Sequence, residues 1–278
     1  KKRYKALLAA MLTGALAAGC LAGCGKMDGT AGGKMKKVTL NEVAHSIFYA
    51  PQYAAIELGY FEEEGIDLTL VNGAGADKVM TALISGDAQI GFMGSEASIY
   101  VSQEGADDPA VNFAQLTQRA GNFLVGRTAQ PDFKWEDLKG KKVLGGRAGG
   151  MPQMVFEYIL KKNGLDPVND LTIDQSISFG LTAAAFTSND SDHTVEFEPF
   201  ATALEQEGNG YVVASLGKDS GYVPYTAYSA KKSYIEKHPE IIQKFTNAIQ
   251  KGLDYVNTHS AEEIAETIKP QFKETDTE

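Results

Sequence analysis

Short stretches of alternating apolar and polar residues are separated by helical patterns along most of the chain. Lys37–Val43 and Ile66–Leu70 alternate with a period of two and predict strands with one buried face. Pro51 begins a helical pattern that Gly59 ends. The same patterns predict further strands at 88–93, 111–117 and 123–127, and helices at 77–86 and from Ser95 onward. This succession predicts an α/β fold in which helices cover both faces of a mostly parallel sheet.

A second set of the same elements begins near residue 132. Strands are predicted at 142–145, 171–174 and 211–215, and Met151-Pro152 begins a helix that reaches Lys162. The strongest helical pattern covers Pro239–Thr258, and its apolar face consists of Ile241, Ile242, Phe245, Ile249, Leu253 and Val256. The length of 278 residues fits two α/β lobes of about 100 residues each.

Composition and charge narrow the class of protein. Hydrophobic residues make up 43% and charged residues 22% of the chain, which is typical of a globular protein and excludes a disordered, collagen-like or multi-span membrane protein. The net charge is -10 and the pI is about 5.0. An acidic chain lacks the basic surface that binds phosphates, so we expect no nucleic-acid partner.

Residues 1–24 have the layout of a bacterial export signal. Basic residues come first, an apolar run covers Ala6–Gly19, and Leu21-Ala22-Gly23-Cys24 resembles a lipobox, which predicts that Cys24 is lipidated. The alternative is an uncleaved membrane anchor, but the run is broken by glycines and is short for a span of about 20 residues. Residues 25–35 are predicted to form a flexible tether. Removing the leader leaves 22 basic and 36 acidic residues, so the lipid must hold the acidic body at the outer face of the membrane.

Catalytic patterns are missing from the remainder of the chain. The two cysteines, Cys20 and Cys24, both lie in the leader, so no disulfide, thiolate nucleophile or cysteine metal site is available to the body. His-Glu-x-x-His and Gly-x-Ser-x-Gly do not occur. The four histidines are scattered, and His193, beside the polar run 188–192, is expected in a loop. We therefore expect no catalytic residue, no metal and no cofactor.

Candidate binding residues lie where the predicted strands end. In open α/β sheets, ligands bind beyond the carboxyl ends of the strands, where loops lead into helix N-termini with free backbone N–H groups. Aromatic rings, hydroxyls and Gly-rich backbone at these ends suit a small polar or heteroaromatic molecule. The candidates are His45, Ser46, Phe48, Tyr49, Asn72, Gly94, Ser95, Arg119, Arg147, Gly149, Gly150 and Glu198.

Each candidate also has a purely structural interpretation. A lone His45 is more often a hydrogen-bonded loop residue than a ligand contact, and Phe48 and Tyr49 fit a core as well as a pocket. The glycines at 73–75 and 145–150 lack the remaining residues of the dinucleotide and P-loop motifs. Arg119 and Arg147 face either an anion or solvent. Glu198 either enters a cleft or ends a strand.

Several stretches resemble one family of transport proteins. These are residues 45–55 (HSIFYAPQYAA) with 58–68 (LGYFEEEGIDL), 82–94, 138–143 (LKGKKV) and 197–201 (FEPFA). Together they resemble the substrate-binding proteins of ABC importers that serve nitrate, aliphatic sulfonates, taurine and the pyrimidine precursor of thiamine. The resemblance covers most of residues 36–258.

The resemblance implies a type II periplasmic-binding-protein-like fold with a ligand cleft between two lobes. Lobe one would comprise residues 36–127 and 228–278, and lobe two residues 128–227. Ligand would be trapped by hinge closure and the closed monomer presented to ABC permease and ATPase subunits. Two solute classes remain open. The pyrimidine binders carry a Trp and an Asn-rich run where this chain has Val43-Ala44-His45-Ser46, whereas Ser46, Ser95 and the 145–150 loop supply donors for a sulfonate.

Two other functions remain as alternatives. A solute-sensing lipoprotein would have the same sequence features. A pyrimidine-forming synthase resembles this family but uses a Cys-rich segment and a lysine-bound cofactor, and the body of this chain contains no cysteine. Fold alone does not decide among them.

Overall fold

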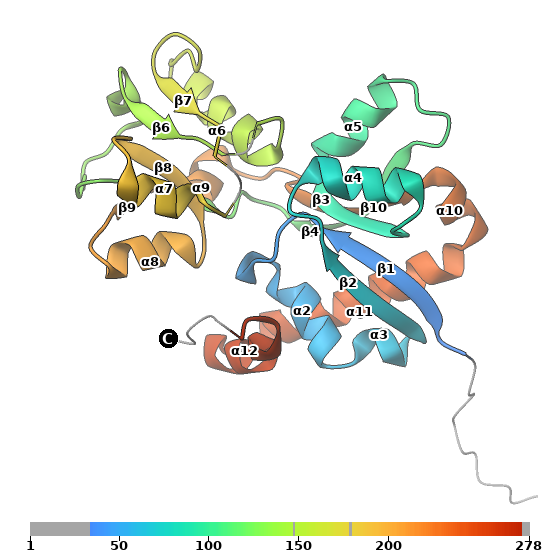
Figure 1. The fold of residues 1–278 in the computed structure, drawn as a ribbon. Helices are drawn as coiled ribbons and strands as arrows, with labels where there is room; N and C mark the ends of the chain where they lie inside the picture. Colours follow the sequence, from blue (N-terminus) through green and yellow to red (C-terminus); the bar gives the residue numbers. More distant parts are fainter. Residues whose placement is uncertain (1–33, 147, 178–179, 274–278) are drawn as a thin grey trace, which may run out of the picture. The chain divides into compact units, whose positions relative to one another are not determined.

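Two five-stranded sheets organise the residues that the structure describes. It is a computed structural model describing residues 34–146, 148–177 and 180–273. The predicted leader with Cys24, most of the tether, and Arg147 lie outside the described residues. We call each sheet with its helices a lobe, and Figure 1 shows lobe one carrying β1–β4 and β10 and lobe two carrying β5–β9.

The sheet of lobe one has the order β2-β1-β3-β10-β4. Its strands are β1 (Lys36–Glu42), β2 (Ile66–Asn72), β3 (Ile90–Gly94), β4 (Ala110–Thr117) and β10 (Thr226–Lys231). β1 lies parallel to β2 and β3, whereas β10 runs antiparallel to both of its neighbours. β3 is buried along its whole length, as expected for a strand covered by helices on both faces.

Helices cover both faces of this sheet (Figure 1). One face carries η1 (Ile47–Tyr49), α2 (Ala50–Glu57), α3 (Tyr60–Glu63), α11 (Pro239–Thr258) and α12 (Ala261–Ile268), which is followed by η3 (Lys269–Gln271). The other face carries α4 (Ala76–Ser85) and α5 (Glu96–Gln103). α10 (Lys232–Lys237) links β10 to α11. The predicted apolar face of α11 is confirmed, since Ile241, Phe245 and Ile249 are buried.

The sheet of lobe two has the order β7-β6-β8-β5-β9. Its strands are β5 (Asn122–Gly126), β6 (Lys142–Leu144), β7 (Thr172–Asp174), β8 (His193–Phe197) and β9 (Tyr211–Ser215). η2 (Trp135–Leu138), α6 (Met151–Lys162) and α9 (Leu216–Ser220) pack on one face, and α7 (Thr182–Ser188) and α8 (Phe200–Gln206) on the other. β5 runs antiparallel to β8 and β9, so each sheet holds one antiparallel strand.

The chain crosses between the lobes at 118–121 and again at 221–225. The two crossings are hydrogen-bonded to each other, because Val223 N donates to Gln118 O at 3.0 Å and Tyr225 N donates to Thr117 O at 3.1 Å. The strand predicted at 123–127 was expected in lobe one, which is wrong, because β5 pairs with strands of lobe two. A strand pattern indicates that a strand forms and does not indicate which sheet it joins.

Two strands of the structure, β8 and β10, were not predicted from the sequence. His193 was expected in a loop, which is wrong, because it is the first residue of β8 and is buried. β8 and β10 were not recognised, since both carry buried polar residues that hide an apolar pattern, among them Thr194, Glu196 and Ser229. Within the described ranges, no helix is both long and apolar enough to cross a membrane.

Candidate functional site

Two adjoining pockets lie between the lobes, and residues of both lobes line each of them. The Glu196 pocket includes His45 and Ser46 from lobe one, and Thr182, Glu196, Glu198 and Phe200 from lobe two. The Glu96 pocket includes Tyr49, Gly94 and Glu96 from lobe one and Gly150 and Met151 from lobe two, with Tyr225 and Thr226 at the second crossing. Pro152 and Phe197 line both. The space in the two pockets, counted together with the open solvent at their mouths, is about 520 and 470 Å³.

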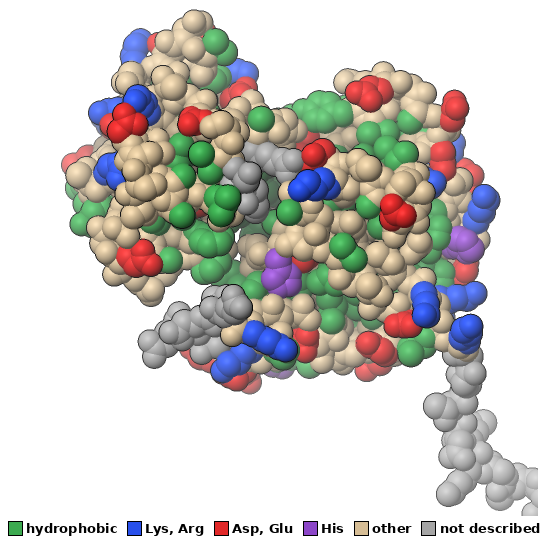
Figure 2. Space-filling view, viewed as in Figure 1, with side chains coloured by type: hydrophobic (Ala, Val, Ile, Leu, Met, Phe, Trp, Pro, Cys, Tyr) green, Lys and Arg blue, Asp and Glu red, His purple; other side chains and the backbone are tan. Residues whose placement is uncertain are grey.

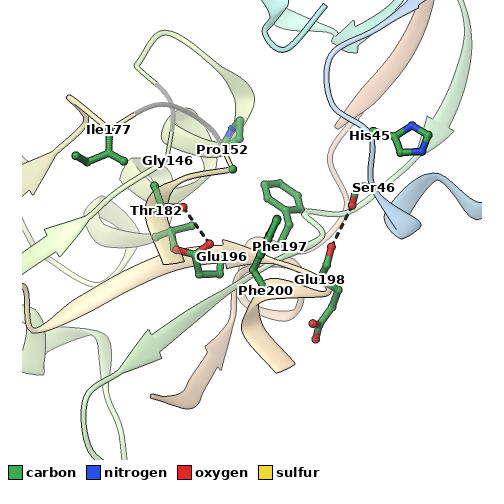
Figure 3. A pocket seen from close by; sticks show the side chains of 12 residues that line it. His45, Ser46, Gly146, Pro152, Ile177, Thr182, Glu196, Phe197, Glu198 and Phe200 are labelled. Carbon is green, nitrogen blue, oxygen red and sulfur yellow. Dashed lines mark hydrogen bonds between the residues drawn. The ribbon is translucent and has the colours of Figure 1, made fainter. Parts of the chain in front are cut away.

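Figure 2 shows the surface hollowed between the lobes. Figure 3 shows the Glu196 pocket from close by, with Thr182 hydrogen-bonded to Glu196 and Ser46 reaching Glu198 from the opposite lobe. Five apolar side chains of lobe two form much of its wall: Pro152, Ile177, Val195, Phe197 and Phe200.

Ser46, in the loop that follows β1, forms a hydrogen bond between the lobes. It caps η1, because its Oγ accepts a hydrogen bond from Phe48 N at 3.3 Å. The same Oγ donates to the backbone oxygen of Glu198 at 3.2 Å. Glu198 also precedes a cis peptide bond to Pro199. One side chain thus fixes the loop after β1 and contacts the wall contributed by lobe two.

His45 has both ring nitrogens engaged. Nδ1 lies 2.7 Å from Oε1 of Glu42, and Nε2 lies 2.9 Å from the backbone oxygen of Gln271. Glu42 is fully buried and also accepts hydrogen bonds from Gln52 and Tyr53. The hydrogen bond that Nδ1 donates to the Glu42 carboxylate is the main reason that the pKa of His45 is raised above 6.5. His45 therefore shapes the pocket rim with no ring nitrogen left over for a solute.

Phe48 and Tyr49 have different positions. Phe48 packs between the lobes, with its ring 5.8 Å from Phe197 and 6.0 Å from Tyr225, and a side chain at Gly121 would collide with it. Tyr49 is buried against β3 and lines the Glu96 pocket. Burial raises the pKa of the Tyr49 hydroxyl, which therefore stays protonated and remains a hydrogen-bond donor.

Glu96 occupies the first turn of α5 and is 2% exposed. Its Oε1 accepts a hydrogen bond from Met151 N at 2.9 Å, which joins α5 of lobe one to the N-terminus of α6 in lobe two. Its Oε2 is buried without a hydrogen-bond partner. Burial raises the pKa of Glu96 to about 7, because it removes the hydration that stabilises the charged carboxylate.

Glu196 is a second buried carboxylate, also 2% exposed. The hydroxyls of Thr194 and Thr182 donate to it at 2.6 and 3.0 Å. Burial outweighs these hydrogen bonds and raises its pKa to about 7. The carboxylate of Glu198, in contrast, accepts two hydrogen bonds from Thr202, both at 3.0 Å.

The other sequence candidates that the structure describes line neither pocket. Oδ1 of Asn72 accepts from Ala74 N at 2.8 Å, and Ser95 donates to the backbone oxygen of Pro224. Arg119, on the first crossing, donates to Gly217 O at 3.0 Å and lies 4.1 Å from the ring centroid of Tyr222. Gly149 N donates to Gln153. Arg147 lies outside the described residues. The candidates that do line the pockets are His45, Ser46, Tyr49, Gly94, Gly150 and Glu198.

Comparison with known proteins places the chain in a family. The family model described as "NMT1/THI5 like" matches residues 46–263. The "Putative binding protein YtlA" of Bacillus subtilis (strain 168) is 49% identical over 242 residues, which cover 87% of this chain and 72% of that protein. The chain belongs to the NMT1/THI5-like family. Its resemblance to this group of proteins, noted from the sequence, is confirmed.

Two further likenesses show the range of the NMT1/THI5-like family and its fold. The "4-amino-5-hydroxymethyl-2-methylpyrimidine phosphate synthase THI11" of Saccharomyces cerevisiae is 24% identical over 81% of this chain and 68% of its own length. The crystal structure of the periplasmic aliphatic sulphonate binding protein SsuA from Escherichia coli superposes with a TM-score of 0.69 at 18% identity, covering 86% of this chain and 79% of that chain. The predicted two-lobe periplasmic-binding-protein fold is confirmed.

In this NMT1/THI5-like chain, the pockets have an acidic lining. Glu96, Glu196 and Glu198 line them, and neither pocket contains a Lys or Arg among the described residues. Sequence reasoning missed Glu96, Glu196 and Tyr225. An acidic residue in the first turn of a helix is common, so the residue type of Glu96 did not indicate a binding role. Its position directly after Gly94-Ser95, at the end of a strand, was the available signal. In the part of the chain that the structure describes, no group of three or more His, Cys, Asp or Glu is placed to hold a metal ion.

Proposed function

We propose that this protein is the extracytoplasmic solute-binding subunit of an ABC importer, which captures a small organic solute between its lobes and delivers it to a permease. The observation that carries the proposal is that each pocket is lined by both lobes. A solute held there contacts both lobes at once, so its binding energy favours the closed arrangement over the open one. The relative named as a binding protein supports the same function.

Interlobe contacts supply a mechanism for closure. Two hydrogen bonds join the lobes beside the pockets. One runs from Ser46 Oγ to Glu198 O, and the other from Met151 N to Glu96 Oε1. The paired crossings at 118–121 and 221–225 are the connections between the lobes, about which opening would occur. Opening breaks the two contacts, and a solute that bridges the pocket walls opposes that opening.

Binding and closure are tested together in solution. Thermal-shift and calorimetric titrations of the full chain against sulfonates, taurine, nitrate, aminopyrimidines and thiamine precursors identify a ligand. At about 100 times its Kd, a ligand adds about 2.7 kcal/mol of stability. Small-angle scattering of the same samples is expected to show a smaller radius of gyration with the ligand. A bound ligand that leaves the radius unchanged, together with unchanged affinity in Ser46→Ala, contradicts capture by closure.

Membrane attachment through Cys24 is a separate part of the proposal. We expect Cys24→Ala to abolish lipid labelling and to move the protein from the membrane to the soluble fraction. Cys20→Ala is the matched control and is expected to behave as the native chain. Retention of Cys24→Ala in the membrane fraction contradicts lipid anchoring at this residue.

A pyrimidine-forming synthase is the second candidate, because several relatives carry that name. Those relatives are 24% identical or less, and both cysteines of this chain fall within its first 24 residues. The same titrations separate the candidates, since a binding protein returns its ligand unchanged and an enzyme converts it. Mass spectrometry of the recovered ligand gives the answer. A solute-sensing lipoprotein would also return its ligand unchanged, and cross-linking to an ABC permease distinguishes the importer subunit from it.

A further inference from the structure

The ring of His45 lies between two groups that accept hydrogen bonds. Nδ1 is 2.7 Å from Oε1 of Glu42, and Nε2 is 2.9 Å from the backbone oxygen of Gln271 in η3. A neutral imidazole has one N–H donor and one acceptor nitrogen, whereas an imidazolium has two donors. With Glu42 ionised, both contacts are therefore hydrogen bonds only when His45 is protonated.

The surroundings of Glu42 favour its ionised form. The side chain is fully buried, and its Oε2 accepts hydrogen bonds from Gln52 Nε2 at 2.8 Å and from the Tyr53 hydroxyl at 2.9 Å. Donors that bond a carboxylate stabilise its charged form. The imidazolium of His45 supplies the opposite charge that a buried carboxylate requires, and the hydrogen bond between them raises the pKa of His45 above 6.5.

His45 connects η3 to the rim of the Glu196 pocket, which it lines (Figure 3). Its ring packs on the rings of Tyr53 and Phe272, at centroid distances of 4.8 and 4.6 Å. Gln271 Nε2 also donates to Glu57 on α2. The segment that follows α12 is thus held against lobe one beside the pocket, and the hydrogen bond to His45 is one of its attachments.

Deprotonation of His45 removes one of its two hydrogen bonds. The remaining ring proton stays with Glu42, because a hydrogen bond to a charged acceptor is stronger than one to a carbonyl oxygen. Nε2 then presents a lone pair to the backbone oxygen of Gln271, which loses this donor. The side chain of His45 is 30% exposed, so its proton exchanges with solvent while the lobe stays folded.

Further ionisable groups lie on the elements around His45. In the part of the chain that the structure describes, the loop after β1, α2, the η3 segment and lobe two contribute Glu42, Tyr53, Glu57, Lys269, Lys273, Glu196 and Glu198. Glu42 supplies the electrostatic attraction that adds to the hydrogen bond in raising the pKa of His45. Burial raises the pKa of Glu196 to about 7, so the test must separate its titration from that of His45.

We infer that His45 is a pH switch at the rim of the Glu196 pocket: its imidazolium joins η3 to the Glu42 carboxylate, and loss of the proton releases η3 and loosens the rim. The stabilisation is fully present below pH 6.5 and is lost as the pH rises through the pKa of His45. The inference goes beyond the proposed function, because it concerns regulation of the pocket rim and its test needs no solute.

Hydrogen exchange of the full chain measures this release, read by mass spectrometry on peptides from 43–50 and 261–272. After correction for the intrinsic exchange rate, we expect the protection of both peptides to fall by about tenfold from pH 5.5 to pH 9, which corresponds to about 1.4 kcal/mol. The fall is expected to be absent in His45→Gln, whose side chain does not titrate. His259→Gln, directly before α12, is the matched control and is expected to behave as the native chain.

Two outcomes of the exchange experiment overturn the inference. The first is protection of the native chain that stays constant from pH 5.5 to pH 9. The second is a fall that persists in His45→Gln, which would assign the release to another group such as Glu196.

A second measurement on the native chain does not depend on a variant that folds. In protein labelled with ¹⁵N-histidine, NMR is expected to show both ring nitrogens of His45 protonated at pH 5.5, and a titration midpoint that coincides with the midpoint of the release. A neutral ring at pH 5.5, or two different midpoints, overturns the inference. The proposed function is tested separately by the ligand titrations, since neither exchange nor histidine NMR requires a solute.

Discussion

Glu196 makes the stability of this protein depend on pH. Its carboxyl is buried in β8 and accepts hydrogen bonds from two threonine hydroxyls. Burial raises its pKa from 4.5 to about 7. The folded state therefore favours the protonated form, so the associated stability is fully present below pH 4.5 and is lost as the pH rises through 7. Glu196→Gln keeps a neutral side chain that can bond both hydroxyls at every pH.

The size of the effect follows from the pKa difference. At roughly 1.36 kcal/mol for each pKa unit, the rise from 4.5 to about 7 corresponds to about 3 kcal/mol. About 2 kcal/mol of this falls between pH 5.5 and 8.5 by the same linkage relation. The buried carboxyl of Glu96 has a similar pKa, but it is present in both proteins and cancels from their difference.

Urea unfolding of the full chain measures this difference. Native protein and Glu196→Gln are compared at intervals from pH 5.5 to 8.5, above the pI of about 5.0. We expect the free energy of unfolding of Glu196→Gln to rise relative to that of the native protein by about 2 kcal/mol over this range. Glu104→Gln, at an exposed position, controls for a lost surface charge. A constant difference between native protein and Glu196→Gln at all pH values refutes the reasoning.

Three further predictions concern packing and hydrogen bonding. In Gly252→Ala, the new methyl would collide with the α2 backbone, and we expect a loss of about 1–3 kcal/mol by urea unfolding; an unchanged midpoint contradicts the close approach. Ser46→Ala removes the η1 cap and the hydrogen bond to Glu198, and is expected to cost about 1 kcal/mol in the same assay; full native stability would argue against both contacts. NMR titration is expected to place the midpoint of His45 above 6.5, and lower in Glu42→Gln; equal midpoints rule out Glu42 as the cause.

The sequence predicted the fold where burial and apolar character coincide. β2 and α11 were found because their buried positions are apolar and regularly spaced. β8 was missed because His193, Thr194 and Glu196 are buried there, and burial of a polar residue depends on partners elsewhere in the chain. The prediction that β5 belongs to lobe one was also wrong, because sheet membership depends on pairing with β8 and β9.

The sequence predicted part of the candidate site on each lobe, because the candidates Gly150 and Glu198 of lobe two line the pockets together with candidates of lobe one. Strand ends led directly to Ser46, Tyr49 and Gly94, which line the pockets. Glu96 and Tyr225 acquire their significance from burial between lobes, which leaves one atom of each unpaired. Local sequence does not encode an unpaired atom, since its presence depends on which backbone groups the opposite lobe brings close.

The position of β10 constrains the order in which the chain folds as it leaves the ribosome. This strand lies between β3 and β4 and pairs with residues synthesised much earlier, since Thr226 and Thr117 are 109 positions apart. Until residue 231 emerges, the facing edges of β3 and β4 have no neighbour, and unpaired edges favour aggregation. Lobe two, whose strands lie within 122–215, has all of its sheet available sooner. All strands of lobe two are therefore synthesised before the sheet of lobe one can be completed, and a chain kept unfolded until β10 has been made does not expose the gap.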